Sequence, residues 1–292
     1  DSACIIPSVH ITAENVATIK EYTKKIAEEM HVVGLMNMQY AIEKGKVYVL
    51  EANPRASRTV PLVSKVCNVR MVPIATDIIT SELTGRPSPV PALKEQHIPY
   101  YGVKEAVFPF NMFPEVDPIL GPEMRSTGEV LGLSTYYGEA FYKAQEATQT
   151  LLPTSGTVLI SVNRKDKDEV IEIAQLFEKA GFKILATSGT YAIITAAGVK
   201  AEKVKKLQEG RPNINDLITN GSIDLIVNSP SGKESAHDDS YLRKAAIKAK
   251  IPYVTTIAGA RATAKGILYV QAHGDSDVKS LQELHSEIKD AE

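Results

Sequence analysis

Three oxygen-bearing side chains and two arginines lie close together in the N-terminal part of this 292-residue sequence. Gln39 precedes a polar turn, and the segment after the turn contains Glu51, Asn53, Arg55 and Arg58. Hard divalent cations prefer carboxylate and amide oxygens, and arginine binds phosphate through its planar fork. These residue types predict metal–nucleotide chemistry. The alternative interpretation is a surface hairpin with ordinary solvated charges.

Two short strands around the turn would bring these side chains together. Residues 35–41 and 47–52 are rich in apolar, β-branched and aromatic side chains, and a polar turn with a glycine separates them. Folding this hairpin places Gln39 roughly opposite Leu50 or Glu51. The pattern therefore predicts that the metal-type donors share one small volume.

The end of the second strand determines how the remaining groups are placed. Side chains alternate between the two faces of a strand, so Glu51 and Asn53 are expected on the same face. Pro54 lacks an N–H donor and ends the ladder, which leaves Arg55 and Arg58 at the rim. One carboxylate is sufficient for Mg²⁺, because this ion normally keeps water and phosphate oxygens as ligands.

Composition bounds the class of protein. The 43% hydrophobic fraction is sufficient for two cores, and the net charge of −2 gives no electrostatic argument for nucleic-acid binding. No apolar run approaches membrane-spanning length and no signal peptide is visible. Cys4 and Cys67 lie in apolar surroundings and indicate buried thiols in a reducing cytoplasm. Because Asp1 replaces an initiator methionine, we expect a processed or excised fragment.

Helical and strand patterns are irregularly mixed in the first half of the chain. Thr12 is suited to cap a helix that extends to Met30, and Gly85 is a stop signal for a second helix. The expected helices are residues 12–30, 72–83 and one from 137, and the expected strands include 103–110.

From residue 157 the pattern changes to a regular alternation of strands and helices. Such alternation with continuous apolar strands predicts a doubly wound parallel sheet. We therefore expect an α/β protein with domains at residues 1–150 and 151–292. The expected strands are 158–162, 182–186, 223–228 and 253–257, and the expected helices are 168–180, 191–197, 213–220 and 240–250.

Small polar residues follow three of these strands. In parallel sheets, ligands bind at the carboxyl ends of the strands, often on helix N-termini. Hydroxyls and free N–H groups there suit a phosphate or carboxylate, and Lys167 and Lys206 could add positive charge. The alternative is that small residues only make tight turns. The segments are residues 187–190, 228–233 and 255–256.

The N-terminal half resembles the ATP-grasp core of the carbamoyl phosphate synthetase large subunit, at the end of its second synthetase domain. Residues 37–41, 51–61, 63–65 and 117–130 carry this resemblance. The resemblance implies a cytoplasmic ATP-dependent ligase of arginine or pyrimidine biosynthesis, which phosphorylates carbamate to carbamoyl phosphate. It also implies a glutaminase small subunit as a partner.

The same resemblance assigns roles to the hairpin residues. Mg²⁺ or Mn²⁺ with its bound ATP would lie on Gln39, Glu51 and Asn53. Arg55 and Arg58 would hold the transferred phosphoryl group or the carbamate. Together these features imply a partial ATP-grasp lobe of α+β type.

The C-terminal half resembles a methylglyoxal-synthase-like domain, the allosteric module of the same large subunit, through residues 186–190 and 209–212. Some members of this domain family bind nucleotide monophosphates such as UMP or IMP, so the resemblance implies a phosphate site in this half of the chain. Pro230 stands where a threonine is expected, and Gly210-Arg211-Pro212 replaces the catalytic segment of the true lyase. The implied phosphate-site residues are Lys167, Thr187, Thr190, Lys206 and Asn228, and the implied ornithine-type contacts are Asp1, Glu105 and Thr255.

The resemblance also implies a missing part. The nucleotide-gripping lobe of the family lies upstream of Asp1, and an ATP-grasp site closes between two lobes. We therefore expect the isolated chain to lack synthetase activity and to need the upstream part of the large subunit. A competing interpretation is a catalytically inert fragment that acts only as an allosteric module for nucleotides or ornithine.

Overall fold

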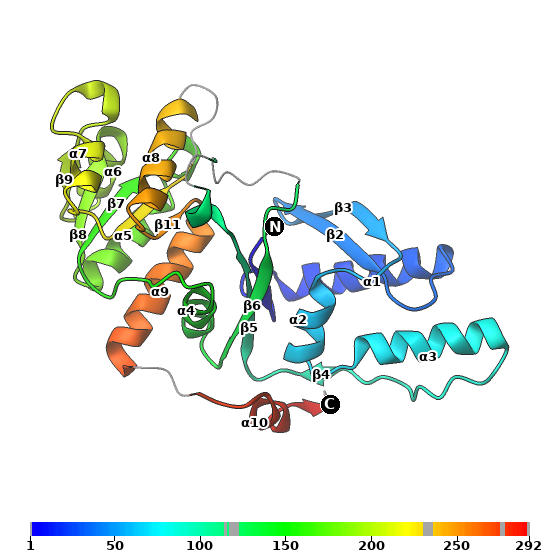
Figure 1. Ribbon diagram of the computed structural model, residues 1–292. Helices are drawn as coiled ribbons and strands as arrows, with labels where there is room; N and C mark the ends of the chain where they lie inside the picture. Colours follow the sequence, from blue (N-terminus) through cyan, green and yellow to red (C-terminus); the bar gives the residue numbers. More distant parts are fainter. Residues whose placement is uncertain (1, 114–115, 117–122, 230–235, 275–277, 291–292) are drawn as a thin grey trace. The chain divides into compact units, whose positions relative to one another are not determined.

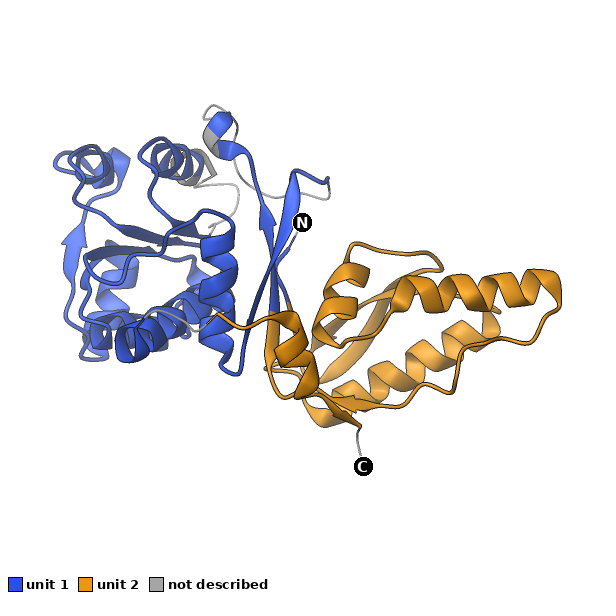
Figure 2. Cartoon of the chain, turned by 60° about the horizontal axis from the view of Figure 1, so that its bottom comes forward, with its two compact units in different colours: residues 1–4, 103–277 blue, residues 5–102, 278–292 orange. Residues whose placement is uncertain are grey.

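The computed structural model describes residues 2–113, 116, 123–229, 236–274 and 278–290 (Figure 1). Contacts divide the chain into two compact units (Figure 2). Unit 1 comprises Asp1–Cys4 and Val103–Asp277, and unit 2 comprises Ile5–Gly102 and Val278–Glu292. The predicted boundary after residue 150 lies inside unit 1, and as a division between family domains it stays a prediction.

Unit 2 contains a hairpin packed on a long helix. The N-terminal cap predicted at Thr12 is confirmed, since its hydroxyl accepts the Asn15 N–H at 3.2 Å. Met30, the expected end of this helix, is its C-cap residue and is 47% exposed. The elements are α1 (Ala13–Glu29), β2 (Asn37–Glu43), β3 (Lys46–Asn53), α2 (Thr59–Val66), α3 (Met71–Thr84), β4 (Gln96–His97), α10 (Leu281–Ser286) and β12 (Lys289–Asp290).

Short contacts hold unit 2 together. The Tyr40 hydroxyl lies 2.7 Å from the Thr23 hydroxyl and ties β2 to α1. Tyr100 is 1% exposed and its hydroxyl donates to the Val66 carbonyl at 2.8 Å, which closes the C-terminal end of α2. Gly85 ends α3 in the left-handed conformation at φ 64°, as its position in the sequence predicted.

The five-stranded sheet of unit 1 has the order β11-β10-β7-β8-β9, and all of its pairings are parallel. This confirms the predicted doubly wound sheet. The edge strand β9 and the long helix α9 were not predicted. The elements are β7 (Thr157–Ser161), α5 (Val170–Lys179), β8 (Lys183–Thr187), α6 (Ser188–Ala196), β9 (Glu202–Val204), α7 (Ile214–Thr219), β10 (Leu225–Asn228), α8 (Ala236–Lys248), β11 (Tyr253–Val254) and α9 (Ile257–His273).

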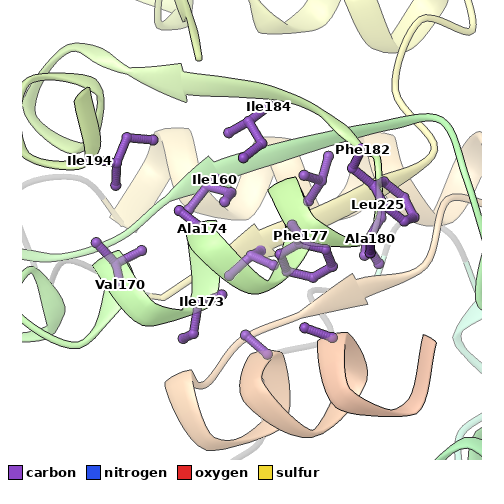
Figure 3. Packing of buried hydrophobic residues seen from close by; sticks show 14 of the residues in the cluster. Ile160, Val170, Ile173, Ala174, Phe177, Ala180, Phe182, Ile184, Ile194 and Leu225 are labelled. Atoms are coloured by element: carbon purple, nitrogen blue, oxygen red, sulfur yellow. The ribbon is translucent and has the colours of Figure 1, made fainter. Parts of the chain in front are cut away.

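Apolar side chains alternate across this sheet and fill two cores. Ile160, Ile184 and Leu225 point into the core formed with α5, α6 and α9 (Figure 3). Leu159 and Ile226 point into the opposite core, against α7 and α8. Burial on both faces explains why these strands are continuously apolar in sequence.

The described part of unit 1 that comes before this sheet in sequence includes two strands and a helix. The helix α4 (Tyr137–Ala147) packs closely on β6 (Gly128–Ser134) and on α9. A Cβ on Gly132 would collide with the backbone of Ala140 and Ala144, so this approach requires glycine. The remaining elements of the chain are β1 (Cys4–Ile6), β5 (Tyr101–Val107), β6 (Gly128–Ser134), α4 (Tyr137–Ala147) and the 3-10 turns η1 (Phe110–Met112), η2 (Arg164–Asp166) and η3 (Leu207–Glu209).

Candidate functional site

The β2–β3 hairpin pairs Gln39 directly with Glu51. This confirms the expected register. The ladder is irregular next to this pair, because Tyr40 is opposite Val49 and Leu50 has no partner of its own. An extra residue of this kind is a β-bulge, which locally redirects side chains.

The bulge decides which face Glu51 occupies. Tyr40 contacts α1 through Thr23, so Val49, its cross-strand partner, lies on the face toward α1. Strict alternation from Val49 would place Glu51 on that same face. The extra residue Leu50 instead puts Glu51 on the outward face with Gln39, away from α1.

The donor set on this outward face suits a hard cation. The Asn53 amide contacts Glu51 Oε1, and both Gln39 and Glu51 are exposed. Exchanging the amide oxygen and nitrogen of Asn53, which are assigned from hydrogen bonding, would turn its oxygen toward the same point. Nowhere in the described chain do three His, Cys, Asp or Glu side chains form a metal cluster. The residues present therefore fit an ion that takes one carboxylate and keeps other ligands.

The segment after β3 carries both arginines and is ordered by hydroxyl contacts. Asn37 donates to the Ser57 hydroxyl at 3.3 Å, and Ser57 lies 2.6 Å from the Thr59 hydroxyl. Arg55 donates to the carbonyl of Ala56 at 3.0 Å, and Arg58 is the N-cap residue of α2. Both arginines are exposed, so their guanidinium groups remain accessible at the end of the hairpin. The helix α2 and this hydroxyl network were not predicted.

A second candidate site lies at the carboxyl edge of the five-stranded sheet. Ser161 ends β7 and is flanked by the ends of β8 and β10. Its hydroxyl lies 3.1 Å from the Thr187 hydroxyl, and its carbonyl accepts the Asn228 amide at 3.2 Å. Thr190 accepts the Val162 N–H at 3.3 Å. Thr187, Thr190 and Asn228 are 3%, 1% and 2% exposed, so these predicted site residues are preordered by the fold.

The Lys167 amine lies at the N-terminus of α6. A Cβ built on Gly189, in the first turn of that helix, would be 2.5 Å from Lys167 Nζ. A helix N-terminus carries partial positive charge, so an amine beside it is favourable when an anion binds to both. Lys206 follows β9 on the same edge of the sheet, and its N–H donates to Glu209 at 3.0 Å.

Sequence reasoning missed Ser161 and Asn163 at this edge. The Asn163 N–H donates to the Ser229 hydroxyl at 2.9 Å, which joins the two strands where the strand order reverses. Such reversal points are where ligands bind in open α/β sheets. The spacing of Asn163 and Asp166 is a cap signal that could have indicated this turn.

Glu105, predicted as an ornithine-type contact, is largely buried on β5. Burial raises its pKa to about 7, opposed by hydrogen bonds from the Ala106 backbone and Gln145 and by the charge of Lys104. Asp1, Pro230 and residues 117–122 of the resemblance in residues 117–130 lie outside the described residues. Thr255 follows β11 at the carboxyl edge of the sheet. The structure does not record a contact between Glu105 and Thr255 in the part it describes.

Two family models match the chain. One is described as "Carbamoyl-phosphate synthase L chain, ATP binding domain" and matches residues 1–83, which include the hairpin. The other is described as "MGS-like domain" and matches residues 169–255, which start two residues after Lys167. Within the chain that the structure describes, none of the helices is long and apolar enough to cross a membrane.

Curated relatives match nearly the whole chain. The "Carbamoyl phosphate synthase large chain" of Archaeoglobus fulgidus is 46% identical over 98% of this chain and 26% of its own length. The "Carbamoyl phosphate synthase large chain, C-terminal section" of Aquifex aeolicus is 44% identical over 98% of this chain and 56% of its own length. The chain thus spans about a quarter of the full-length relative and about half of the C-terminal section. A solved methylglyoxal synthase from Elizabethkingia anophelis is 21% identical over 38% of this chain and 77% of its own, with a TM-score of 0.32.

Proposed function

We propose that this chain, which belongs to the family of carbamoyl phosphate synthase large chains and corresponds to their C-terminal part, supplies the metal-binding half of the site that phosphorylates carbamate with ATP. The product of this ligase reaction is carbamoyl phosphate. The observation that carries the proposal is the direct pairing of Gln39 with Glu51, with Asn53 beside the same carboxylate.

One set of hairpin residues would bind the metal, and the two arginines after the hairpin would bind phosphate. Gln39, Glu51 and Asn53 offer one carboxylate and two amide oxygens, which leaves positions for water and phosphate oxygens on Mg²⁺ or Mn²⁺. When bound, the ion would neutralise charge on the ATP phosphates. Arg55 and Arg58 would position the transferred phosphoryl group or the carbamate and stabilise its charge.

Manganese binding in the presence of ATP tests the hairpin. We expect Glu51→Gln to weaken Mn²⁺ binding by roughly tenfold or more, because even residues that only hydrogen-bond to metal ligands change metal affinity by this factor. Electron paramagnetic resonance measures the Mn²⁺ affinity. Glu43→Gln, at the far end of β2 in the same hairpin, is the matched control and should bind as the wild type does. Equal Mn²⁺ affinity in Glu51→Gln and wild type would contradict the metal assignment.

Turnover should require more of the enzyme than this chain. Because the chain spans about a quarter of the full-length relatives, we expect synthesis only with the rest of the large chain and with a glutaminase small subunit. Carbamoyl phosphate formation by the 292-residue chain alone would refute this expectation.

A second function is favoured by the carboxyl edge of the sheet. We propose that unit 1 binds a nucleotide monophosphate effector through Lys167, Thr187, Thr190, Lys206 and Asn228. The position of the Lys167 amine at the N-terminus of α6 supports a phosphate site there. Methylglyoxal synthase activity is not expected, because the lyase segment is replaced, and dihydroxyacetone phosphate should not be consumed.

Calorimetry with UMP, IMP and ornithine tests this second function. Thr190→Val should abolish saturable nucleotide binding, because it removes a buried hydroxyl at the edge of the sheet. Thr195→Val, on the same helix, should not, since the Thr195 hydroxyl donates to carbonyls of its own helix, Tyr191 at 2.7 Å and Ala192 at 3.4 Å. Binding unaffected by Thr190→Val would contradict the site. Nucleotide binding without any Mn²⁺–ATP binding would favour the competing interpretation, an allosteric module alone.

A further inference from the structure

Lys167 lies in a short segment, residues 163–169, that is anchored at its N-terminal end. We call this the Lys167 segment. The Asn163 N–H donates to the Ser229 hydroxyl at 2.9 Å, and the Asn163 amide donates to Asp166 at 2.7 Å. Asn163 Oδ1 also accepts the N–H groups of Lys165 and Asp166, at 2.7 and 3.1 Å. The first turn of the segment is therefore fixed to the end of β10.

The C-terminal end of the Lys167 segment is held by an arginine from another helix. Arg261 of α9 lies 2.9 Å from Glu169 and 3.0 Å from Glu172. Its side chain is 15% exposed, whereas the two glutamates are 58% and 51% exposed. A largely buried guanidinium that bridges two carboxylates is better ordered than a single surface ion pair. Arg261 thus fixes the first turn of α5 to α9.

The charges around Lys167 explain why the contacts of Arg261 with Glu169 and Glu172 matter for the position of the lysine amine. Asp166 and Asp168 flank Lys167 in sequence, Glu169 comes next, and Glu172 follows in the first turn of α5. Arg164 and Lys165 on the N-terminal side offset part of this negative charge, but a free glutamate is a competing partner for the lysine amine. Arg261 pairs with both glutamates, so neither is left as a free partner for the amine. The Lys167 amine can then extend to the N-terminus of α6, where the structure places it.

From these contacts we propose that Arg261 is a positioning residue of the anion site, acting through Lys167. It anchors the Lys167 segment and removes the glutamates that would otherwise compete for the lysine amine. This inference rests on the proposed effector site in unit 1. It goes beyond that site because Arg261 belongs to α9 and lies among carboxylates, not among the residues assigned to phosphate.

A double-mutant cycle with inorganic phosphate as the probe tests the proposal. In the wild-type background, Arg261→Gln should weaken phosphate binding about 3- to 30-fold, the range expected for a residue that acts through a network. In the Lys167→Gln background the same substitution should have almost no further effect. Arg261→Lys should restore binding partly, because an ammonium lacks the fork that holds two carboxylates. Lys183→Gln removes an exposed ion pair at the other end of β8, and it is the matched control.

Three results would overturn the proposal. An equal loss from Arg261→Gln in both backgrounds would mean that it acts through general charge or folding. Unchanged amide hydrogen exchange in the Lys167 segment of Arg261→Gln, measured without phosphate, would show that Arg261 does not anchor it. The hydrogen-exchange measurement tests the anchoring role of Arg261 even if the Lys167→Gln variant binds phosphate too weakly to titrate. If Thr190→Val leaves phosphate binding intact, the effector site itself is wrong, and the inference fails with it.

Discussion

Gln39 and Glu51 are direct cross-strand partners, and the bulge residue Leu50 lies immediately next to that pair. The bulge turns Glu51 to the outward face, where Asn53 contacts it. A single extra residue therefore determines whether the carboxylate faces solvent or α1. The hairpin therefore places the Glu51 carboxylate opposite Gln39 and beside the Asn53 amide, at an accessible position.

Gln39→Glu would place a second carboxylate opposite Glu51. Like charges directly opposite each other destabilise a strand pair, so the variant should lose about 0.2–1 kcal/mol of stability without divalent ions. With Mn²⁺ present, the Gln39→Glu variant should instead be more stable than the wild type, because a second carboxylate increases affinity for the ion. Thermal unfolding with and without Mn²⁺ measures both effects. Ala41→Glu is the control, since Ala41 is opposite Tyr48 and not Glu51. If Mn²⁺ stabilises the Gln39→Glu variant no more than the wild type, that result would count against the metal site.

Gly189→Ala would separate anion binding from stability. The new Cβ would lie 2.5 Å from Lys167 Nζ, so the amine must leave the N-terminus of α6. Alanine is the better helix former, by up to about 1 kcal/mol, so the melting temperature should not fall. We expect weaker phosphate binding, measured by NMR titration, in a fully folded protein. Unchanged phosphate affinity would show that Lys167 is not a ligand.

Glu105 should make the stability of the protein depend on pH. Burial raises its pKa to about 7 from an ordinary value of 4.5, so the native state binds the proton more tightly than the unfolded state. Its contribution to stability is therefore complete below about pH 4.5, is lost as pH rises to about 7, and amounts to on the order of 3 kcal/mol at most. Glu105→Gln should lack this decline and be the more stable protein at pH 8.

Denaturant unfolding from pH 4.5 to pH 8 measures the effect of Glu105. The matched control is Glu146→Gln, which replaces an exposed carboxylate on α4 and should leave the wild-type profile unchanged. Parallel profiles for wild type and Glu105→Gln would contradict the assignment of the pH dependence to Glu105.

Gly132→Ala should destabilise unit 1 strongly. Its Cβ would collide with the backbone of α4 at Ala140 and Ala144, which cannot move without displacing the helix. We expect a loss of about 1–3 kcal/mol or more in the free energy of unfolding. Gly128→Ala in the same strand has nothing within 4 Å and should be nearly neutral. Similar losses at both positions would mean that general strand effects, and not the close approach of α4, explain the result.

Local signals in the sequence determined much of this fold. The N-cap at Thr12 and the left-handed stop at Gly85 depend only on neighbouring residues, and the structure has both. Continuous apolar strands separated by helices predicted the parallel sheet, because burial on both faces leaves no room for alternation. The hairpin register of Gln39 and Glu51 followed from the turn between the strands. The helix α9 was missed because small residues such as Ala260 and Gly266 weaken its apolar pattern.

Only the tertiary structure decided how the candidate sites are built. The bulge at Leu50 arises from the fit of the hairpin, and no local signal marked it. The Lys167 amine reaches Gly189, and Arg261 reaches Glu169, across 22 and 92 residues of sequence. Contacts between distant segments depend on how helices pack on the sheet, which short-range pattern does not encode. The sequence by itself therefore determined which residue types could do the chemistry, and packing decided which of them meet.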